Sequence, residues 1–347
     1  MQKLWIWYGV FLGTFLLAGV FNHSLQTDFN YIKFFFILPF VALATTPLSE
    51  KGLNCVKISF VSACLSMAFI SGLMILYSYA TVKGFTFENG EIVHTLLLGE
   101  RIYIGLYMGI AAFITFNYIR FSKQPKWVNW TSTGAFVLIV LFVILISSRI
   151  GFLCLLILAT TEVYKLVCSK KLNWFALFAG FVVLSTVVYN TSLFDRIAYR
   201  TAYNEPFLTS LLEYEARAEI WPCAVKTVNA QTVWFGNGYE DSQNLLVNCY
   251  NGIEKESKRA WFLERKFNSH NQFINVLMGS GIFSLLALLW FLFNSAWKQR
   301  HNLHLLGLLA CLVTFMLIEN ALYRQSGLYI AVFVFLLMQR TKLETNK

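Results

Sequence analysis

Residues 130–167 read WTSTGAFVLIVLFVILISSRIGFLCLLILATTEVYKLV and are almost continuously apolar. As a single α-helix this stretch would be roughly 55 Å long, at about 1.5 Å per residue, whereas the hydrocarbon core of a bilayer is about 30 Å thick. The chain must therefore reverse direction inside it. The only polar break is Ser147-Ser148-Arg149, followed by Gly151. We predict two membrane spans here, Trp130–Ser147 and Ile150–Val167, joined by a tight turn.

The whole chain has the composition of an integral membrane protein. Its 347 residues are 57% hydrophobic, 17% aromatic and 13% charged, against about 25% charged residues in an ordinary soluble domain. This composition excludes a disordered, fibrous or disulfide-stapled secreted protein and argues against a soluble enzyme. Apolar windows predict eight further spans: Leu4–Val20, Tyr31–Thr46, Lys57–Ala80, Arg101–Ile119, Trp174–Tyr189, Asn271–Trp297, Leu303–Ile318 and Ser326–Met338. The predicted fold is an all-α membrane protein with about ten transmembrane helices.

The cations predict the orientation of these spans. The net charge is +10, and a basic chain can bind nucleic acid, but here the cations follow the loops. With the N-terminus in the cytoplasm, every predicted inner loop is basic, whereas the short outer connections carry few cations; this is the positive-inside pattern. We therefore expect both termini in the cytoplasm, lipid as the surroundings of the chain, and no nucleic acid partner.

One outer segment differs from the short connections. Residues 190–269 are polar and contain ten of the 18 acidic residues and nine of the 28 basic ones. A connection this long is uncommon without a function. We predict three parts: an N-terminal transmembrane bundle of about seven spans (1–189), a large periplasmic loop (190–269) and a C-terminal bundle of about three spans (270–347).

The sequence lacks the familiar motifs of metal and cofactor sites. The seven cysteines show no Cys-x-x-Cys spacing, and neither a phosphate-binding Gly-rich loop nor an Asp-x-Asp pair is present. We therefore expect no metal and no cofactor. Only Cys223 and Cys249 fall in the outer loop, and the sequence leaves open whether they form a disulfide.

Three polar features gather on the predicted outer face. Arg149 ends two apolar spans, where a cation either reaches the lipid headgroups or binds an anion in a cavity. Arg217 shares a helix face with Trp221 by its i, i+4 spacing, either as a surface residue or as a planar donor to phosphate oxygens. His270 begins the eighth span, where Asn268 or Ser269 would cap the helix. The helix N-terminus favours neutral imidazole, which can accept a proton from a hydroxyl; the alternative is an ordinary interfacial residue.

The last outer turn adds a fourth feature. Glu319 and Arg324 flank it, and either they pair with each other or Arg324 joins the other cations. The topology places Arg149, Arg217, His270 and Arg324 on the same side of the membrane. Arginines beside a neutral histidine suit a reaction in which a diphosphate leaves and a hydroxyl attacks.

In this order and on this side, the motifs resemble those of the O-antigen ligase/polymerase family of membrane glycosyltransferases. The matching pieces are Ser148-Arg149-x-Gly151, Arg217-x-x-x-Trp221, Phe235-Gly236-x-Gly238 and Ser269-His270-Asn271-Gln272-Phe273. The resemblance covers about residues 130–340. One difference from typical O-antigen ligases is that seven rather than about nine spans precede the loop, which leaves the subfamily open.

The resemblance implies a GT-C-like architecture and a metal-independent transfer of a glycan from undecaprenyl diphosphate to a lipid A–core hydroxyl at the periplasmic face. It implies that Arg149 and Arg217 bind the diphosphate, and we expect Arg324 to join them. His270 would orient or deprotonate the acceptor. As further substrate-positioning residues we expect Glu219, Trp221 and Asn271.

Three other functions stay open at this point. A polysaccharide polymerase and a protein O-oligosaccharyltransferase would use the same donor site with another acceptor. A polysaccharide transporter or flippase is a different class, in which ionisable residues usually lie near the middle of the membrane. Here the charges collect at one rim instead, which favours transfer over transport.

The predicted topology can be tested with reporter fusions. Fusions at Gln124, in a predicted inner loop, and at Ser257, in the large outer loop, should report opposite sides of the membrane. Reporters that show the same side would contradict either the reversal at Arg149 or the number of spans.

Overall fold

The computed structural model describes residues 2–44, 48–81, 95–121, 125–168 and 215–340, and within these ranges all regular elements are helices. The chain divides into two compact units, the first made of Met1–Pro47 with Leu212–Lys347 and the second of Leu48–Leu211. Each unit is described by itself. The three-part division at residues 189 and 269 concerns sidedness in the membrane and stays a prediction.

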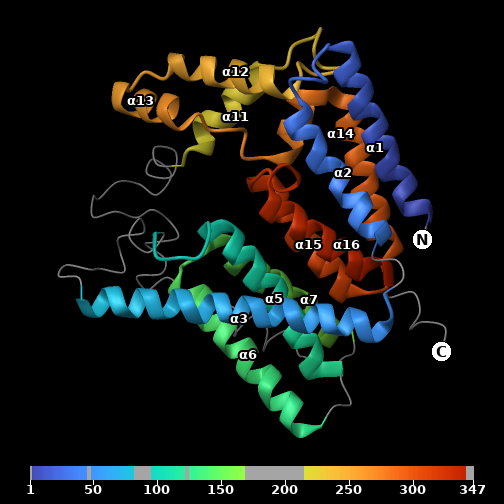
Figure 1. The fold of residues 1–347 in the computed structure, drawn as a ribbon, viewed down its shortest axis with the longest axis vertical. Coiled ribbons are helices and arrows are strands. Elements are labelled where there is room, and N and C mark those ends of the chain that lie inside the picture. The colour runs from blue at the N-terminus through green and yellow to red at the C-terminus, as the bar shows by residue number, and fades with distance from the viewer. Residues whose placement is uncertain (1, 45–47, 82–94, 122–124, 169–214, 341–347) are drawn as a thin grey trace. The chain divides into compact units, whose positions relative to one another are not determined.

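Within its described residues the first unit contains two N-terminal and six C-terminal α-helices, and Figure 1 shows their arrangement. They are α1 (Gln2–Phe21), α2 (Phe29–Ala44), α11 (Arg217–Lys226), α12 (Tyr239–Cys249), α13 (Glu256–Arg265), α14 (Gln272–Lys298), α15 (Leu303–Ile318) and α16 (Gln325–Arg340), with short 3-10 helices at Tyr250–Gly252 (η1) and Ala321–Tyr323 (η2). The described helices of the second unit are α3 (Glu50–Thr81), α5 (Arg101–Phe121), α6 (Lys126–Leu145) and α7 (Arg149–Cys168).

Nine of the ten predicted spans coincide with helices, and the tenth, Trp174–Tyr189, lies outside the described residues. Five helices are long and apolar enough to cross a membrane: α3, α5, α6, α7 and α14. The helices α1, α2, α15 and α16 are apolar but shorter. These helices identify a membrane protein, while the count of ten spans stays a prediction.

The predicted break between the fifth and sixth spans is confirmed. Helix α6 ends at Leu145 and α7 begins at Arg149, and between them Ser147 has a left-handed φ of 48°. Gly151, in the first turn of α7, lies against the end of α6: a Cβ added there would approach Val143 Cγ1 to 2.8 Å. The polar triplet therefore ends one helix and starts the next.

Two glycines allow α5 to pack closely against the start of α7. Gly105 and Gly109 are four residues apart on α5, a small-xxx-small spacing that lets helix backbones approach in membranes. A Cβ at Gly105 would collide with the side chain of Ser148, and one at Gly109 with Cys154. The matching order of these contacts along both helices shows that α5 and α7 run in the same direction.

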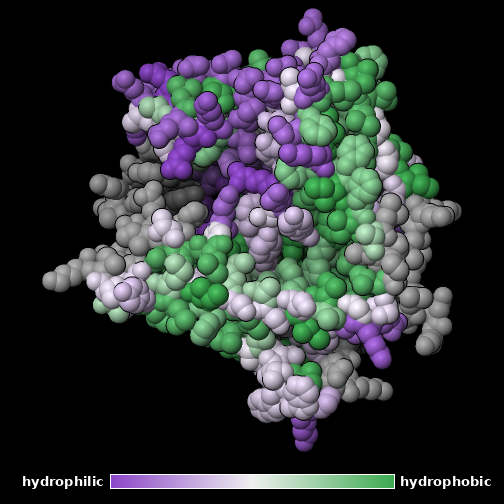
Figure 2. All heavy atoms as spheres, in the orientation of Figure 1, coloured by the Kyte–Doolittle hydropathy of each residue, from purple (hydrophilic) through white to green (hydrophobic). Residues whose placement is uncertain are grey.

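In the first unit, α1 and α14 pack antiparallel. At one end the Trp5 ring lies 6.2 Å from Phe291; at the other, Phe21 stacks 4.4 Å from Phe235, which lies 5.8 Å from Phe283. This matches the opposite directions predicted for the first and eighth spans. Figure 2 shows hydrophobic side chains gathered over α1 and α14 and mainly hydrophilic ones over α12 and α13.

Helix α14 is interrupted at Gly281, and the turn at residues 235–238 docks into the interruption. Gly281 has φ 77° and ψ −175°, so the helical hydrogen bonds around it are broken. The loop replaces them: Asn237 N donates to Met278 O (2.8 Å), Gly238 N donates to Gly279 O (3.0 Å), and Ile282 N donates to the loop carbonyl of Val233 (2.8 Å). The predicted turn thus supplies the backbone partners that α14 loses, as unwound backbone within a membrane protein requires.

A carboxylate from the α1–α2 connection caps helix α12. The residue at its N-cap, Gly238, has no side chain to accept from the first backbone amides. Asp28 takes this role: its carboxylate accepts from Tyr239 N and Glu240 N, each at 2.9 Å, and from Ser24 Oγ at 2.7 Å. The outer loop is thereby attached to the N-terminal helices.

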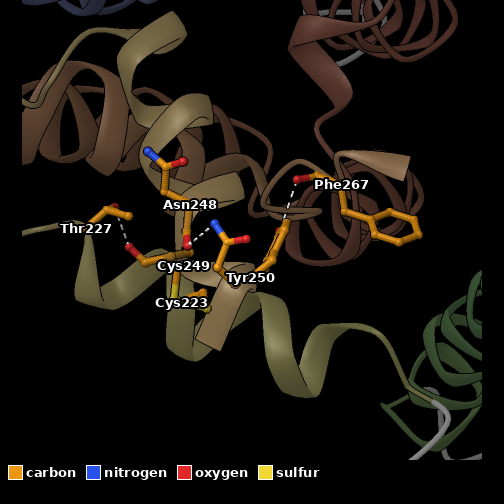
Figure 3. The surroundings of a disulfide bond; sticks show 8 residues. Cys223, Thr227, Asn248, Cys249, Tyr250 and Phe267 are labelled. Atoms are coloured by element: carbon orange, nitrogen blue, oxygen red, sulfur yellow. Dashed lines mark hydrogen bonds between the residues drawn. A yellow bond between two sulfur atoms is a disulfide. The ribbon is translucent and has the colours of Figure 1, made fainter. Parts of the chain in front are cut away.

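A disulfide joins Cys223 of α11 to Cys249 at the end of α12 (Figure 3). It lies in a small core with Leu246 and Phe262, and nearby Tyr250 Oη donates to Phe267 O at 3.0 Å. The structure therefore answers the question that the sequence left open. A disulfide fits an oxidising compartment, which supports the predicted periplasmic location of this loop.

The close approach at Gly281 gives a stability prediction. A methyl group at this position would collide with the backbone of Trp234. The alanine backbone would also have to keep a positive φ, which is unfavourable for a residue with a side chain. We expect Gly281→Ala to lower the melting temperature of the purified protein by at least about 5 °C. The control is Gly252→Ala, where the added atom meets nothing within 4 Å; its melting temperature should stay near that of the parent. Equal melting temperatures for both variants would contradict the docked arrangement.

Candidate active site

Four consecutive side chains, those of residues 269–272, bind the last residues of α15 and the segment that follows this helix. We call residues 317–322 the Glu319 turn. Asn271 Nδ2 donates to Leu317 O at 2.9 Å, and Gln272 Oε1 accepts from Leu322 N at 2.7 Å. Ser269 Oγ lies 3.3 Å from Asn320 Oδ1. Together with the His270 contact described below, these bonds fix the turn from residues about 50 positions away in the sequence.

The cap of helix α14 is Asn271, and the prediction that Asn268 or Ser269 caps it was wrong. Asn271 Oδ1 accepts from Phe273 N and Ile274 N at 2.9 and 3.1 Å. The N-cap thus lies two or three residues after the predicted position. The side chains of Asn268 and Ser269 therefore form other hydrogen bonds. Asn268 Oδ1 accepts from His270 N at 2.9 Å, which holds the backbone just before the helix.

His270 and Glu319 form the central pair of the site. His270 Nδ1 lies 2.8 Å from Glu319 Oε2, and the imidazole packs beside the ring of Phe267 at 5.7 Å. His270 has a left-handed φ of 43°, a conformation that costs energy in a residue with a side chain and is common at functional sites. With Nδ1–H donated to the carboxylate, Nε2 carries the lone pair and can accept a proton.

Glu319 is ionised because of its neighbours. Its side chain is only 3% exposed. This burial alone would raise its pKa, but the hydrogen bond from His270 and the electrostatic interaction with that side chain outweigh it and hold the pKa below the ordinary value of 4.5. The N–H of Asn320 and the charge of Arg324 act in the same direction. The carboxylate therefore stays charged and keeps its hydrogen bond to the imidazole.

Arg217 binds the same turn from helix α11. Its Nε and Nη2 donate to Ile318 O at 3.2 and 2.8 Å, and its Nη1 pairs with Glu215 Oε1 at 2.6 Å. Ile318 is the last residue of α15, so the guanidinium satisfies a carbonyl that has no partner within its own helix. One N–H on each of Nη1 and Nη2 remains beyond these bonds.

Arg324 lines a cavity of about 560 Å³ that adjoins the His270 segment. Its walls also carry Asn268, which binds His270, and Tyr323, together with Lys33 of α2 and Lys266 at the end of α13. The proposed pairing of Glu319 with Arg324 is thus replaced by the Glu319–His270 contact, with the Arg324 charge acting on Glu319 from nearby.

The remaining predicted site residues lie in other surroundings. Arg149 is the first residue of α7 in the second unit and is half-buried. Glu219 Oε1 pairs with Lys258 Nζ at 2.8 Å. Trp221 packs against the disulfide core, and its buried indole N–H has no acceptor in the part of the chain that the structure describes. The structure thus brings Arg217, His270, Asn271 and Arg324 to the Glu319 turn.

No group of three or more potential metal ligands occurs within the described ranges. The sequence pointed to Glu319 but not to its partner, and it did not single out Lys33 and Lys266 as site residues. The partnership of Glu319 with His270 was missed, although an acidic residue at the end of an apolar helix is a signal of function. Lys33 and Lys266 carried no such signal, because each belongs to a segment that is basic or interfacial for other reasons.

Comparison with known protein families gives one match. Residues 134–289, a little under half of the chain, match the model of the family described as O-antigen ligase. No curated protein matches the sequence. The match covers Arg149, Arg217 and His270 and confirms the resemblance predicted from the four motifs. It supports a ligase- or polymerase-like function in general.

The lowered pKa of Glu319 predicts how stability depends on pH. A carboxyl whose pKa falls on folding stabilises the protein while it is ionised, and this contribution is lost as the pH falls through the lowered value. Glu319→Gln should therefore melt below the parent at about pH 7, and the gap should shrink as the pH drops below 4.5. The control is Glu264→Gln, an exposed residue of α13, which should show little gap at any pH. A gap for Glu319→Gln that is unchanged down to about pH 3 would contradict the pairing.

Proposed function

Residues 134–289 belong to the O-antigen ligase family, and from this premise we propose that the chain is a membrane glycosyltransferase with a GT-C-like architecture. It transfers a glycan from undecaprenyl diphosphate to a hydroxyl of lipid A–core at the periplasmic face of the inner membrane. The observation that carries this proposal is the 2.8 Å contact between His270 Nδ1 and Glu319 Oε2, because it prepares a base at the helix entrance where the family motif lies.

The proposed reaction begins at the acceptor. The acceptor hydroxyl loses its proton to His270 Nε2 while its oxygen attacks the anomeric carbon of the donor glycan. A new C–O bond forms, and the bond from that carbon to the diphosphate breaks. Glu319 holds the ring in position and stabilises the imidazolium that results. The residue is already ionised and hydrogen-bonded, so the base needs no rearrangement before reaction.

The leaving diphosphate gains negative charge in this step. We assign Arg149, Arg217 and Arg324 to neutralise it, since guanidinium groups donate to phosphate oxygens in a planar, bidentate way. Arg217 would act with the N–H groups that do not bind Ile318 and Glu215, and it also holds the Glu319 turn in place. No metal ion enters the proposed reaction.

Three further residues would position the substrates. Asn271 fixes the start of α14 and the end of α15 together, so it controls the placement of His270. Trp221 offers its ring and an indole N–H that has no acceptor among the described residues. Glu219, which is bound to Lys258, is assigned to position a substrate from the first turn of helix α11.

The assay uses the purified chain with a lipid-linked glycan donor and measures donor binding and single-turnover transfer separately. His270→Ala should leave donor binding nearly intact and slow transfer by about 10²–10⁴-fold. Glu319→Gln should slow transfer less, because it keeps the shape but loses the charge that holds the ring. Arg149→Ala should weaken donor binding and transfer, and Arg149→Lys should restore them in part.

The exposed Glu264→Gln serves as the control and should transfer at the parental rate. Normal transfer by His270→Ala would overturn the assignment of the base, and normal donor binding and transfer by Arg149→Ala would remove this residue from the donor site. Transfer that vanishes in excess EDTA and returns with magnesium would contradict metal independence. Offering lipid A–core, a second lipid-linked repeat unit or a protein as acceptor distinguishes a ligase from a polymerase and from a protein O-oligosaccharyltransferase.

A further inference from the structure

The cavity beside the Glu319 turn has features that the proposed transfer reaction does not use. It lies within the first unit, between the start of α2, helix α12, the segment after α13 and the start of α16. Its volume of about 560 Å³ falls within the range of small-molecule sites and would hold one or two sugar rings.

The charged groups that line this cavity, among the residues that the structure describes, are all cationic. They are Lys33, Lys266 and Arg324, and no aspartate or glutamate of these residues lines it. Lys33 Nζ donates to Asn30 Oδ1 at 3.0 Å and lies 5.5 Å from the centre of the Phe34 ring. Both partners line the cavity, so these contacts keep the ammonium group at its edge. Three cations around one hollow create a positive potential that attracts an anion.

The backbone on the opposite wall is held firmly. Lys266 ends helix α13 with a left-handed φ of 47°, and its N–H donates to Phe262 O. Gln243 Nε2 reaches across to the carbonyl oxygens of Lys266 and Phe267 at 3.0 and 3.1 Å. Helix α12 thus fixes the segment that carries Lys266, so this cation is presented from a defined backbone.

The uncharged lining suits a carbohydrate. Amide side chains of Asn30, Gln243 and Asn268 line the cavity, and amides form hydrogen bonds with hydroxyl groups as donors and acceptors. Tyr323 lines it too and is stacked on Tyr31, with ring centres 4.7 Å apart and planes 11° apart. A bare oxyanion would need only the cations, whereas amides and a fixed aromatic ring recognise the rest of a sugar.

The cavity is connected to the reactive pair through its own lining. Asn268 accepts a hydrogen bond from the backbone N–H of His270, and the charge of Arg324 acts on Glu319. A ligand here would therefore sit next to the groups assigned to the acceptor hydroxyl.

We propose that this cavity binds an anionic sugar unit of the glycan substrate, with Lys33 and Lys266 around its phosphate or carboxylate and the amides and Tyr323 around its ring. The inference rests on the proposed glycan transfer and adds a substrate class to it: a glycan that carries a negative charge near the reacting unit. Lys33 and Lys266 act as specificity-determining residues, since they contact the substrate away from the bond that breaks.

The test measures binding without turnover. The full chain is placed in nanodiscs of zwitterionic phosphatidylcholine, and its dissociation constants are measured for glucose 6-phosphate, glucuronate, glucose and inorganic phosphate. We expect glucose 6-phosphate and glucuronate to bind at least about 10-fold more tightly than glucose and inorganic phosphate. Lys33→Gln and Lys266→Gln should each weaken the charged sugars by about 10-fold, the loss of roughly one charge-assisted hydrogen bond.

The matched control is Lys226→Gln, an exposed lysine in the last turn of α11 outside the cavity, which should bind like the parent. Both cavity lysines are exposed, so the melting temperatures of the variants should stay near the parental value. His270→Ala should keep its affinity for the charged sugars even though its transfer fails, which separates this site from the proposed reaction.

Four results would overturn the proposal. Equal affinity for glucose and glucose 6-phosphate would show that the cations are not used, and equal affinity for inorganic phosphate would show that the sugar ring is not recognised. Loss of binding in nanodiscs that contain anionic phosphatidylglycerol, with parental binding in phosphatidylcholine, would assign the cavity to lipid headgroups. Unchanged affinity in both lysine variants would equally contradict the assignment.

Discussion

The candidate site depends on how one short turn is held. The turn after α15 ends an apolar helix, so its last carbonyl groups and the carboxylate of Glu319 need partners in a poorly hydrated place. Asn271 and Arg217 bind the carbonyls, and His270 binds the carboxylate. The same contacts that satisfy these buried groups set the orientation of the imidazole. Structural and proposed chemical roles are therefore joined in the same bonds, which explains why two separate sequence motifs converge on this turn.

The third motif has a purely architectural role in the structure. The turn at residues 235–238 fills the interruption of α14 at Gly281 with its own backbone amides. This contact fixes the large loop to α14 less than three helical turns after His270, and the carboxylate of Asp28 fixes the other side of the same loop to the N-terminal helices. The loop is thereby held by backbone amides that donate to α14 and to the Asp28 carboxylate.

The sequence predicted those features that depend on local physical limits. A 38-residue apolar run is too long for one crossing of the bilayer, so its length required a break, and the polar triplet Ser147–Arg149 gave the position of that break. The interruption at Gly281 did not, because a glycine in an apolar run still has the pattern of a continuous helix. The cap was misplaced because several cap-forming residues are adjacent there. The pairing of His270 with Glu319 joins positions 49 residues apart, and no local spacing encodes such a contact.

The pairing of α1 with α14 also has a consequence for how the chain is made. The aromatic face of α1, with Tyr8 and Phe11 fully buried, rests on a helix that begins at Gln272. Ribosomes add about 5–20 residues per second, so α1 waits on the order of 10–50 s for this partner. During that interval Tyr8 and Phe11 have the contacts that α2 supplies through Phe35, and the side of α1 that faces α14 is covered by lipid or by the machinery that inserts membrane helices. Assembly of this unit is therefore a late, long-range step, and its completion depends on synthesis of α14 and the helices after it.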